Sequence, residues 1–139
     1  LKEIGASEII ERNEIDDESG KFLLKPQWSG AFDTVGGNTL NTVLKACKVH
    51  GSVATAGNAR SFKLDTTVFP FILNGVNLLG VNSATCPIDH RKELWDQLSG
   101  KWRISNLHKI GHPMKLEELD HYINEILKGK IMGRMVLEY

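Results

Sequence analysis

The sequence predicts an α/β fold, a doubly wound parallel sheet with helices on both faces in three layers. Strand-like and helical segments alternate along the 139 residues, and repeated strand–helix–strand units fold as parallel sheets. Several strands are almost continuously apolar, as in "VNLLGVN" (residues 76–82), which is typical of strands that are covered on both faces. The composition, 41% hydrophobic and 24% charged, is that of one globular domain.

The N-terminal part predicts one helix end, two strands and a weak helix. "LKEIGASEII" has the pattern of a last helical turn, a C-cap at Gly5 and a short strand over residues 7–10. Residues 15–25 are polar and weakly helical, and "WSGAFDTV" (residues 28–35) is a strand by its apolar residues. Because the chain opens at Leu1, without Met, we expect it to begin inside a domain.

The middle of the chain predicts two further strands, each preceded by a helix. Residues 38–49 carry apolar side chains at helical spacing. "GSVATAG" (residues 51–57) predicts a strand whose small side chains let a helix or a ligand approach the sheet closely. A short helix over residues 66–73, interrupted by Pro70, precedes the apolar strand at residues 76–82.

The C-terminal part predicts two more helices and a last strand. The first helix covers residues 87–98, with Pro87 in its first turn. A short extended piece near residues 109–112 leads into an amphipathic helix over residues 115–128. "IMGRMVLEY" closes the chain as a strand.

Charge, hydropathy and cysteine content exclude several classes of function. The 17 basic and 17 acidic residues cancel and are interspersed, so we expect no nucleic-acid partner. No apolar run reaches the roughly 18 residues that a membrane helix needs, so we expect no membrane partner. Cys47 and Cys86 are far apart in sequence, and we interpret them as the reduced thiols of a cytoplasmic protein.

Three predicted strand ends carry the candidate ligand-binding residues: Asp33–Gly36, Gly57 with Asn58, and Val81–Ser83. The carboxyl ends of parallel strands meet at one edge of the sheet, where ligands bind in such folds. The glycine pair in "VGGNTL" lacks the G-x-G-x-x-G frame, so it predicts a tight strand-to-helix turn rather than a phosphate site. We interpret Asp33 as an acid that orients loop backbone or cofactor rather than as a general base.

Other chemically active residue types form no recognised catalytic pattern. Cys47 and His50 are spaced like metal ligands, but no second pair completes a tetrahedral set, so no zinc site is predicted. The other histidines are scattered among charged residues, and no G-x-S-x-G elbow is present for a serine nucleophile.

Five stretches together resemble a known family: "GAFDTVGG", "GSVATAG", "TTVFPFILNGVNLLGVNS", "CPIDHRKELWDQL" and "GKIMGRMVLEY". They are similar to the zinc-independent medium-chain dehydrogenase/reductases, and within these to the bacterial quinone oxidoreductase subgroup that includes acrylyl-CoA reductase. The third stretch (residues 66–83) is the most specific. The resemblance implies an NADPH-dependent reductase that transfers a hydride from the nicotinamide to a quinone or to an activated C=C bond, such as that of an enoyl or acrylyl thioester.

The resemblance also implies a domain organisation. It makes residues 1–105 part of an NAD(P)-binding Rossmann domain and residues 106–139 a C-terminal segment, a helix and a strand, that returns to the catalytic domain. The family's GroES-like catalytic domain and the first two strands of its cofactor domain, with the glycine-rich turn, have no match here. We therefore expect these 139 residues alone to lack reductase activity and to bind NADPH weakly or not at all.

Site residues follow from the matched motifs. Gly57 borders the cofactor and Asn58 follows it, while Ile72 lies in the motif whose counterpart packs near the nicotinamide. Ser83, which closes "GVNS" after Val81 and Asn82, matches a serine that contacts the cofactor. Two positions lie in the tail. Gly129 stands where relatives often place a polar side chain, and Arg134 either reaches a phosphate or lies on the surface.

A homodimer is expected through the strand at residues 76–82, which would be the last of the sheet. No Lys or Pro blunts this apolar edge, and in relatives the same edge pairs across a two-fold axis. Leu78, Leu79 and Val81 should then lie in or beside the interface. In the alternative, the loop at residues 83–89 covers the edge and the protein is monomeric.

Two other functions stay open. "FDTVGGNTLNTVL" is also similar to the strand-four acidic motif of S-adenosylmethionine methyltransferases, which bind a different nucleotide-type cofactor on the same fold. A non-catalytic role, in which this chain is only a dimerising half, is the other alternative.

Overall fold

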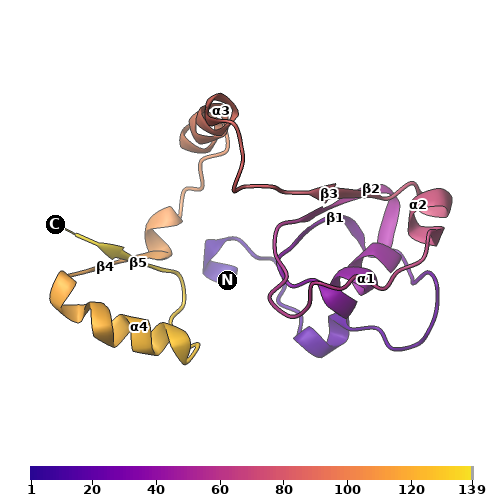
Figure 1. Cartoon of the computed structure of the whole chain (residues 1–139), viewed down its shortest axis with the longest axis horizontal. Coiled ribbons are helices and arrows are strands. Elements are labelled where there is room, and N and C mark those ends of the chain that lie inside the picture. Colours follow the sequence, from indigo (N-terminus) through magenta and orange to yellow (C-terminus); the bar gives the residue numbers. More distant parts are fainter. Residues whose placement is uncertain (139) are drawn as a thin grey trace. The chain divides into compact units, whose positions relative to one another are not determined.

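The computed structural model describes residues 1–138, which divide into two compact units (Figure 1). One unit is Ile10–Pro87, and the other combines Leu1–Ile9 with the chain from Ile88 on. In the part of the chain that the structure describes, no helix has the length and apolar content required to cross a bilayer. The expected assignment of residues 1–105 and 106–139 to two domains stays a prediction.

The unit Ile10–Pro87 is built on a three-stranded parallel sheet. Its strands are β1 (Trp28–Asp33), β2 (Cys47–Thr55) and β3 (Asn77–Gly80), in the order β1-β2-β3. Both pairings are parallel, as the repeated strand–helix–strand pattern predicts. β2 lies in the middle, so β1 and β3 form the two edges of the sheet within this unit.

Two helices cover one face of this sheet: α1 (Gly37–Lys45) and α2 (Phe69–Asn74) (Figure 1). Leu40 and Leu44 of α1 join Cys47, Val53 and Val76 in one buried cluster. Ala31 and Leu78 flank Val53 in register and pack against the same cluster. The next row, Phe32–Ala54–Leu79, points to the other face, where Phe32 is 70% exposed. The expected helix layer on that face is not part of this unit.

The boundary between α1 and β2 differs from the expected one. The helix predicted over residues 38–49 ends at Lys45, and β2 already begins at Cys47. Cys47 pairs with Trp28 of β1, and the Ala46 carbonyl accepts the N–H groups of Gln27 and Trp28. Pairing and hydrogen bonding with β1 therefore end the helix earlier than apolar spacing alone predicts.

The segment before β1 contradicts two expectations. Residues 7–10 form no strand, and the helix expected over residues 15–25 does not form, since only Ile15 belongs to a helix, the short 3-10 helix η2 (Arg12–Ile15). Side chains of α1 hold this segment instead. The Asp17 N–H donates to Thr42 Oγ1 at 2.8 Å, and Lys45 Nζ donates to Asp17 Oδ2 at 2.5 Å. These contacts join distant residues, so local periodicity carries no sign of them.

The second unit agrees with the expected tail. After η1 (Lys2–Ile4), Gly5 adopts φ 113°, the left-handed cap that its sequence predicts. The remaining elements are α3 (Ile88–Ser99), η3 (Leu107–Lys109), β4 (Gly111–Met114), η4 (Leu116–Glu118), α4 (Leu119–Leu127) and β5 (Arg134–Leu137). β4 and β5 pair in parallel, with α4 as the crossover helix.

Candidate functional site

The carboxyl ends of β1, β2 and β3 lie side by side. In the register of the sheet Asp33 stands beside Thr55, and Thr55 stands beside Gly80. The predicted ligand-binding groups therefore lie together where the three strands end, at the carboxyl edge of the sheet. They are Asp33–Gly36, Gly57 with Asn58, and Val81–Ser83. This confirms that the strand ends converge, and it makes this edge the candidate site.

Asp33 is the last residue of β1 at this edge, and only 6% of it is exposed. Its Oδ1 accepts the N–H groups of Val35 and Gly36, both at 3.1 Å. Its Oδ2 accepts the Thr55 hydroxyl at 3.0 Å. The carboxylate thus orients loop backbone, as the sequence predicts for an acid at the end of a parallel strand.

The loop after β2 packs directly on the turn after β1. The Ala59 N–H donates to the Thr34 carbonyl at 3.1 Å, and the Arg60 N–H donates to the Val35 carbonyl at 2.9 Å. Gly57 lies so close that a Cβ on it would meet the Thr34 carbonyl oxygen at 2.9 Å. Close approach of two backbones thus requires the glycine, and the approach holds the exposed Asn58 at the edge.

The glycine pair after β1 forms a tight turn. Gly36 and Gly37 have φ angles of 71° and 60°, which L side chains rarely adopt. A Cβ on Gly36 would collide with the carbonyl oxygen of Ser61, which forms a parallel bridge with Gly36. Ser61 thus covers the turn at the start of α1, and the pair serves backbone packing rather than phosphate binding.

A groove of about 600 Å³ opens beside this turn, lined by Arg12, Asn13, Asp16, Val35, Ala59 and Arg60. Arg60 pairs with Asp16, whose carboxylate also accepts the Thr39 hydroxyl at 2.7 Å. These two hydrogen bonds, first that of Thr39 and then that of Arg60, lower the pKa of Asp16. Two guanidinium groups therefore line a groove at the carboxyl edge, which suits an anionic ligand.

Sequence reasoning missed both Arg12 and Arg60. Arg60 lies only two residues after Asn58. A cation this close to a loop at a strand end could have indicated a site for an anionic ligand. Arg12 gave no such signal, because it lies between the strand expected at residues 7–10 and the helix expected at residues 15–25, where no element or site was predicted. The fold brings it to the groove through η2 and the contacts of Asp16.

The third strand end is joined to the second. The Val81 N–H donates to the Thr55 carbonyl at 2.9 Å. Asn82 then closes a small turn, since its Nδ2 donates to Thr85 Oγ1 at 2.6 Å. Val81, Asn82 and Ser83 are exposed at the edge, where a ligand can reach them.

The other predicted site residues lie elsewhere. Ile72 is on α2, whose last residue, Asn74, donates to the Cys47 carbonyl at the opposite end of β2. Gly129 and Arg134 belong to the second unit. Gly129 has φ 68° just after α4, which accounts for a glycine there, and Arg134 is an exposed residue of β5. Cofactor contacts for these three residues stay predictions.

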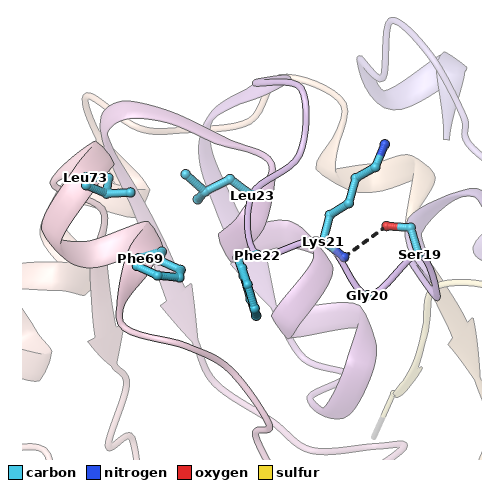
Figure 2. Close-up of a pocket in the computed structure, with 7 residues that line it drawn as sticks. All are labelled: Ser19, Gly20, Lys21, Phe22, Leu23, Phe69 and Leu73. Carbon is cyan, nitrogen blue, oxygen red and sulfur yellow. Dashed lines mark hydrogen bonds between the residues drawn. The ribbon is translucent and has the colours of Figure 1, made fainter.

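A second cavity, of about 470 Å³, has none of the predicted site residues in its lining (Figure 2). Figure 2 shows Phe22 and Leu23 on one side and Phe69 and Leu73 of α2 on the other. The Phe22 and Phe69 rings are 5.3 Å apart, and the Lys21 N–H donates to Ser19 Oγ at 3.3 Å. This lining is mostly apolar and holds none of the chemistry expected of a catalytic site.

Metal-binding residues do not gather in the structure. Within residues 1–138, no group of three His, Cys, Asp or Glu side chains lies close enough to hold a metal ion. Cys47 is a buried free thiol in the core under α1, and burial raises its pKa. A protonated, buried thiol is a poor metal ligand and a poor nucleophile.

Comparison with known proteins places these observations in a family context. No protein-family model matches the chain. YhfP of Bacillus subtilis, named as a quinone oxidoreductase, is 40% identical over 139 residues, which cover 99% of this chain and 42% of the relative. The acrylyl-CoA reductase AcuI of Ruegeria pomeroyi is 36% identical over 138 residues, 99% of this chain and 42% of the relative. The chain thus spans less than half the length of these relatives.

Solved structures agree in fold. The crystal structure of Bacillus subtilis YhfP with NAD bound has a TM-score of 0.93 and 39% identity, over 99% of this chain and 42% of that one. Escherichia coli YhdH with bound NADPH has a TM-score of 0.85 and 34% identity, over 98% of this chain and 42% of that one. The expected resemblance and the NAD(P)-binding Rossmann-like fold are therefore confirmed over the part that the chain spans.

Proposed function

We propose, from the homology of this chain to the cofactor-binding part of NAD(P)-dependent oxidoreductases, that the full-length protein is an NADPH-dependent reductase of quinones or acrylyl-CoA-like enoyl thioesters. The observation that carries the proposal is the convergence of three strand ends at one edge beside a groove lined by two arginines. Relatives that align with nearly all of this chain are crystallised with NAD or NADPH bound.

The residues at this edge fit an anionic dinucleotide. Arg12 and Arg60 offer guanidinium donors to phosphate, while Asn58 and Ser83 offer polar side chains at neighbouring strand ends. The groove of about 600 Å³ has the size of a small-molecule site. Gly57 lets the loop after β2 pack closely against Thr34, which holds Asn58 at this edge.

The chemistry would be supplied mainly by the cofactor, which carries the hydride when it is bound. The part of the protein in this chain binds and orients it. Its arginines would hold the phosphates, and the polar residues after β2 and β3 would set the direction of the nicotinamide. Ile72, Gly129 and Arg134 belong to the same proposal as further contacts of the cofactor.

Homodimerisation and a cytoplasmic location are also part of this proposal. β3 is an edge strand within its unit, and Leu79 on it is 52% exposed. An apolar edge strand without a blunting charge supports pairing with a second copy across a two-fold axis.

Steady-state kinetics of the full-length protein tests the proposed activity. We expect oxidation of NADPH that depends on a quinone or on acrylyl-CoA and that EDTA leaves unchanged. A Ser83→Trp variant should raise the KM for NADPH more than the KM for the second substrate. Loss of turnover in EDTA that zinc restores would contradict the metal-independent mechanism, and binding of S-adenosylmethionine in place of NADPH would favour a methyltransferase.

A further inference from the structure

The carboxylate of Asp33 is buried at the candidate site but does not line its groove. It accepts four hydrogen bonds of 3.0–3.3 Å, three from the backbone N–H groups of Val35 and Gly36 in the turn after β1 and one from the Thr55 hydroxyl. These donors occupy a buried carboxylate that does not face the groove. It can act only through the groups that it holds.

Asp33 and its hydrogen-bond partners are bonded in turn to the loops after β1, β2 and β3. The turn held by Asp33 contains Val35, whose carbonyl accepts the Arg60 N–H at 2.9 Å. The Asp33 carbonyl accepts the Ala56 N–H at 2.8 Å, which begins the loop of Asn58. The Thr55 hydroxyl donates to Asp33, and the Thr55 backbone carbonyl accepts the Val81 N–H at 2.9 Å. Thr55 thus connects Asp33 to the loop after β3.

We propose that Asp33 is a positioning residue for cofactor binding, which sets the mutual placement of the loops after β1, β2 and β3. The proposal rests on the proposed function, because it concerns the same edge. Asp33 acts through hydrogen bonding and not through proton transfer. Substitution of Asp33 should therefore change the affinity for NADPH and not the rate of the chemical step.

The amide analogue separates this role from that of a general base. In Asp33→Asn, the side-chain oxygen can still accept the Val35 and Gly36 N–H groups, and the amide nitrogen can donate to Thr55 Oγ1. In Asp33→Ala all three partners lose their acceptor. Thr55→Val removes only the link between the first two strands, and the valine is close in size to threonine.

The test uses the full-length protein and its three variants, with NADPH affinity measured by the change in nucleotide fluorescence on binding. We expect Asp33→Ala to raise the Kd for NADPH by about tenfold to a hundredfold, with kcat at saturating NADPH within about threefold of wild type. Thr55→Val should fall between Asp33→Ala and wild type. Asp33→Asn should stay within about threefold of wild type in both quantities.

Amide hydrogen exchange gives a second readout that needs no cofactor. Asp33→Ala, or Thr55→Val if the alanine variant does not fold, should lose protection in the segments around residues 35–36, 56–60 and 81, and Asp33→Asn should keep it. Folded variants with wild-type protection and NADPH affinity would overturn the positioning role. Loss of kcat in Asp33→Asn with unchanged Kd would show a general base. If the wild-type protein bound no NADPH, the proposed function and the cofactor role of Asp33 would both be overturned. Loss of protection in the loops of Asp33→Ala would in that case still show that Asp33 holds the three loops together.

Discussion

Gly57 lies against the backbone of Thr34, and a Cβ at residue 57 would meet the Thr34 carbonyl oxygen at 2.9 Å. Real Cβ atoms do not approach a backbone oxygen this closely, so one of the two loops must move if residue 57 gains a side chain. The loop of β2 and the turn of β1 are thus fitted to each other at the edge of the sheet.

A Gly57→Ala substitution should therefore weaken NADPH binding. We expect a rise in Kd of about tenfold in the full-length protein, because the loop that carries Asn58 and Arg60 must shift. Gly30→Ala is the matched control, since its Cβ would lie at an ordinary 3.5 Å from the Ser52 carbonyl. Equal affinities of the two variants, measured by calorimetry, would show that the fit of these loops does not matter for the cofactor.

Apolar periodicity predicts most of the elements of this fold. The strands β1 to β5 and the helices α1 to α4 form where the pattern places them, with shifted ends, whereas the pairing of β4 with β5 was not predicted. The strand predicted at residues 7–10 and the helix predicted at residues 15–25 were wrong. Residues 16–17 are held by side chains of α1, since Thr39 and Lys45 donate to the Asp16 and Asp17 carboxylates and Thr42 accepts the Asp17 N–H, and such contacts between distant residues leave no local period.

The core under α1 should be sensitive to loss of volume. Leu44 is fully buried among Leu40, Cys47, Val53 and Val76. Leu44→Ala is expected to lower the free energy of unfolding by about 2–5 kcal/mol, measured by urea denaturation of the full-length protein. Lys63→Ala on the exposed loop should change it by less than about 0.5 kcal/mol. A loss of similar size in both variants would contradict the packing described for α1.

Asp17 should make stability depend on acid pH. The hydrogen bond from Lys45, and after it that from Ser19, lowers the pKa of Asp17 in the folded protein. Its contribution is therefore present above the unfolded pKa of about 3.9 and is lost as pH falls through the lower, folded pKa. Asp17→Asn should lower the free energy of unfolding by about 1.5–3 kcal/mol at neutral pH and lessen its fall with acid.

Asp89→Asn serves as the control for this prediction. The Asp89 carboxylate is 91% exposed and lies 3.9 Å from Lys92, so its removal should leave the free energy of unfolding at neutral pH close to that of the wild type. The prediction would be wrong if Asp17→Asn and wild type lost stability in parallel between neutral pH and the acid transition.

Leu79→Lys should separate the subunits of the proposed dimer. A lysine on the exposed side of β3 places a charge on the edge where a second copy would pair. We expect light scattering to give a dimer for the full-length wild type and a monomer for the variant. If both are dimers, the interface lies elsewhere, and a monomeric wild type would support the alternative in which the loop after β3 covers the edge.

The candidate site was predictable in part. The order of the elements predicts which residues lie at the carboxyl edge, because parallel strands end at the same edge of a sheet. This located Gly57, Asn58 and Ser83. The arginines of the groove were not predictable in the same way. Arg60 pairs with Asp16 across 44 positions of sequence, and Arg12 reaches the groove on the short 3-10 helix η2, which the sequence pattern did not predict.

A crystal structure of the full-length protein with NADPH tests the central claim most directly. We predict that the cofactor lies along the carboxyl edge of β1–β3, against Gly57, Asn58 and Ser83, with a phosphate in the groove of Arg12 and Arg60. A cofactor bound at another place, or no bound cofactor in crystals grown with saturating NADPH, would contradict the assignment of this edge as the cofactor site.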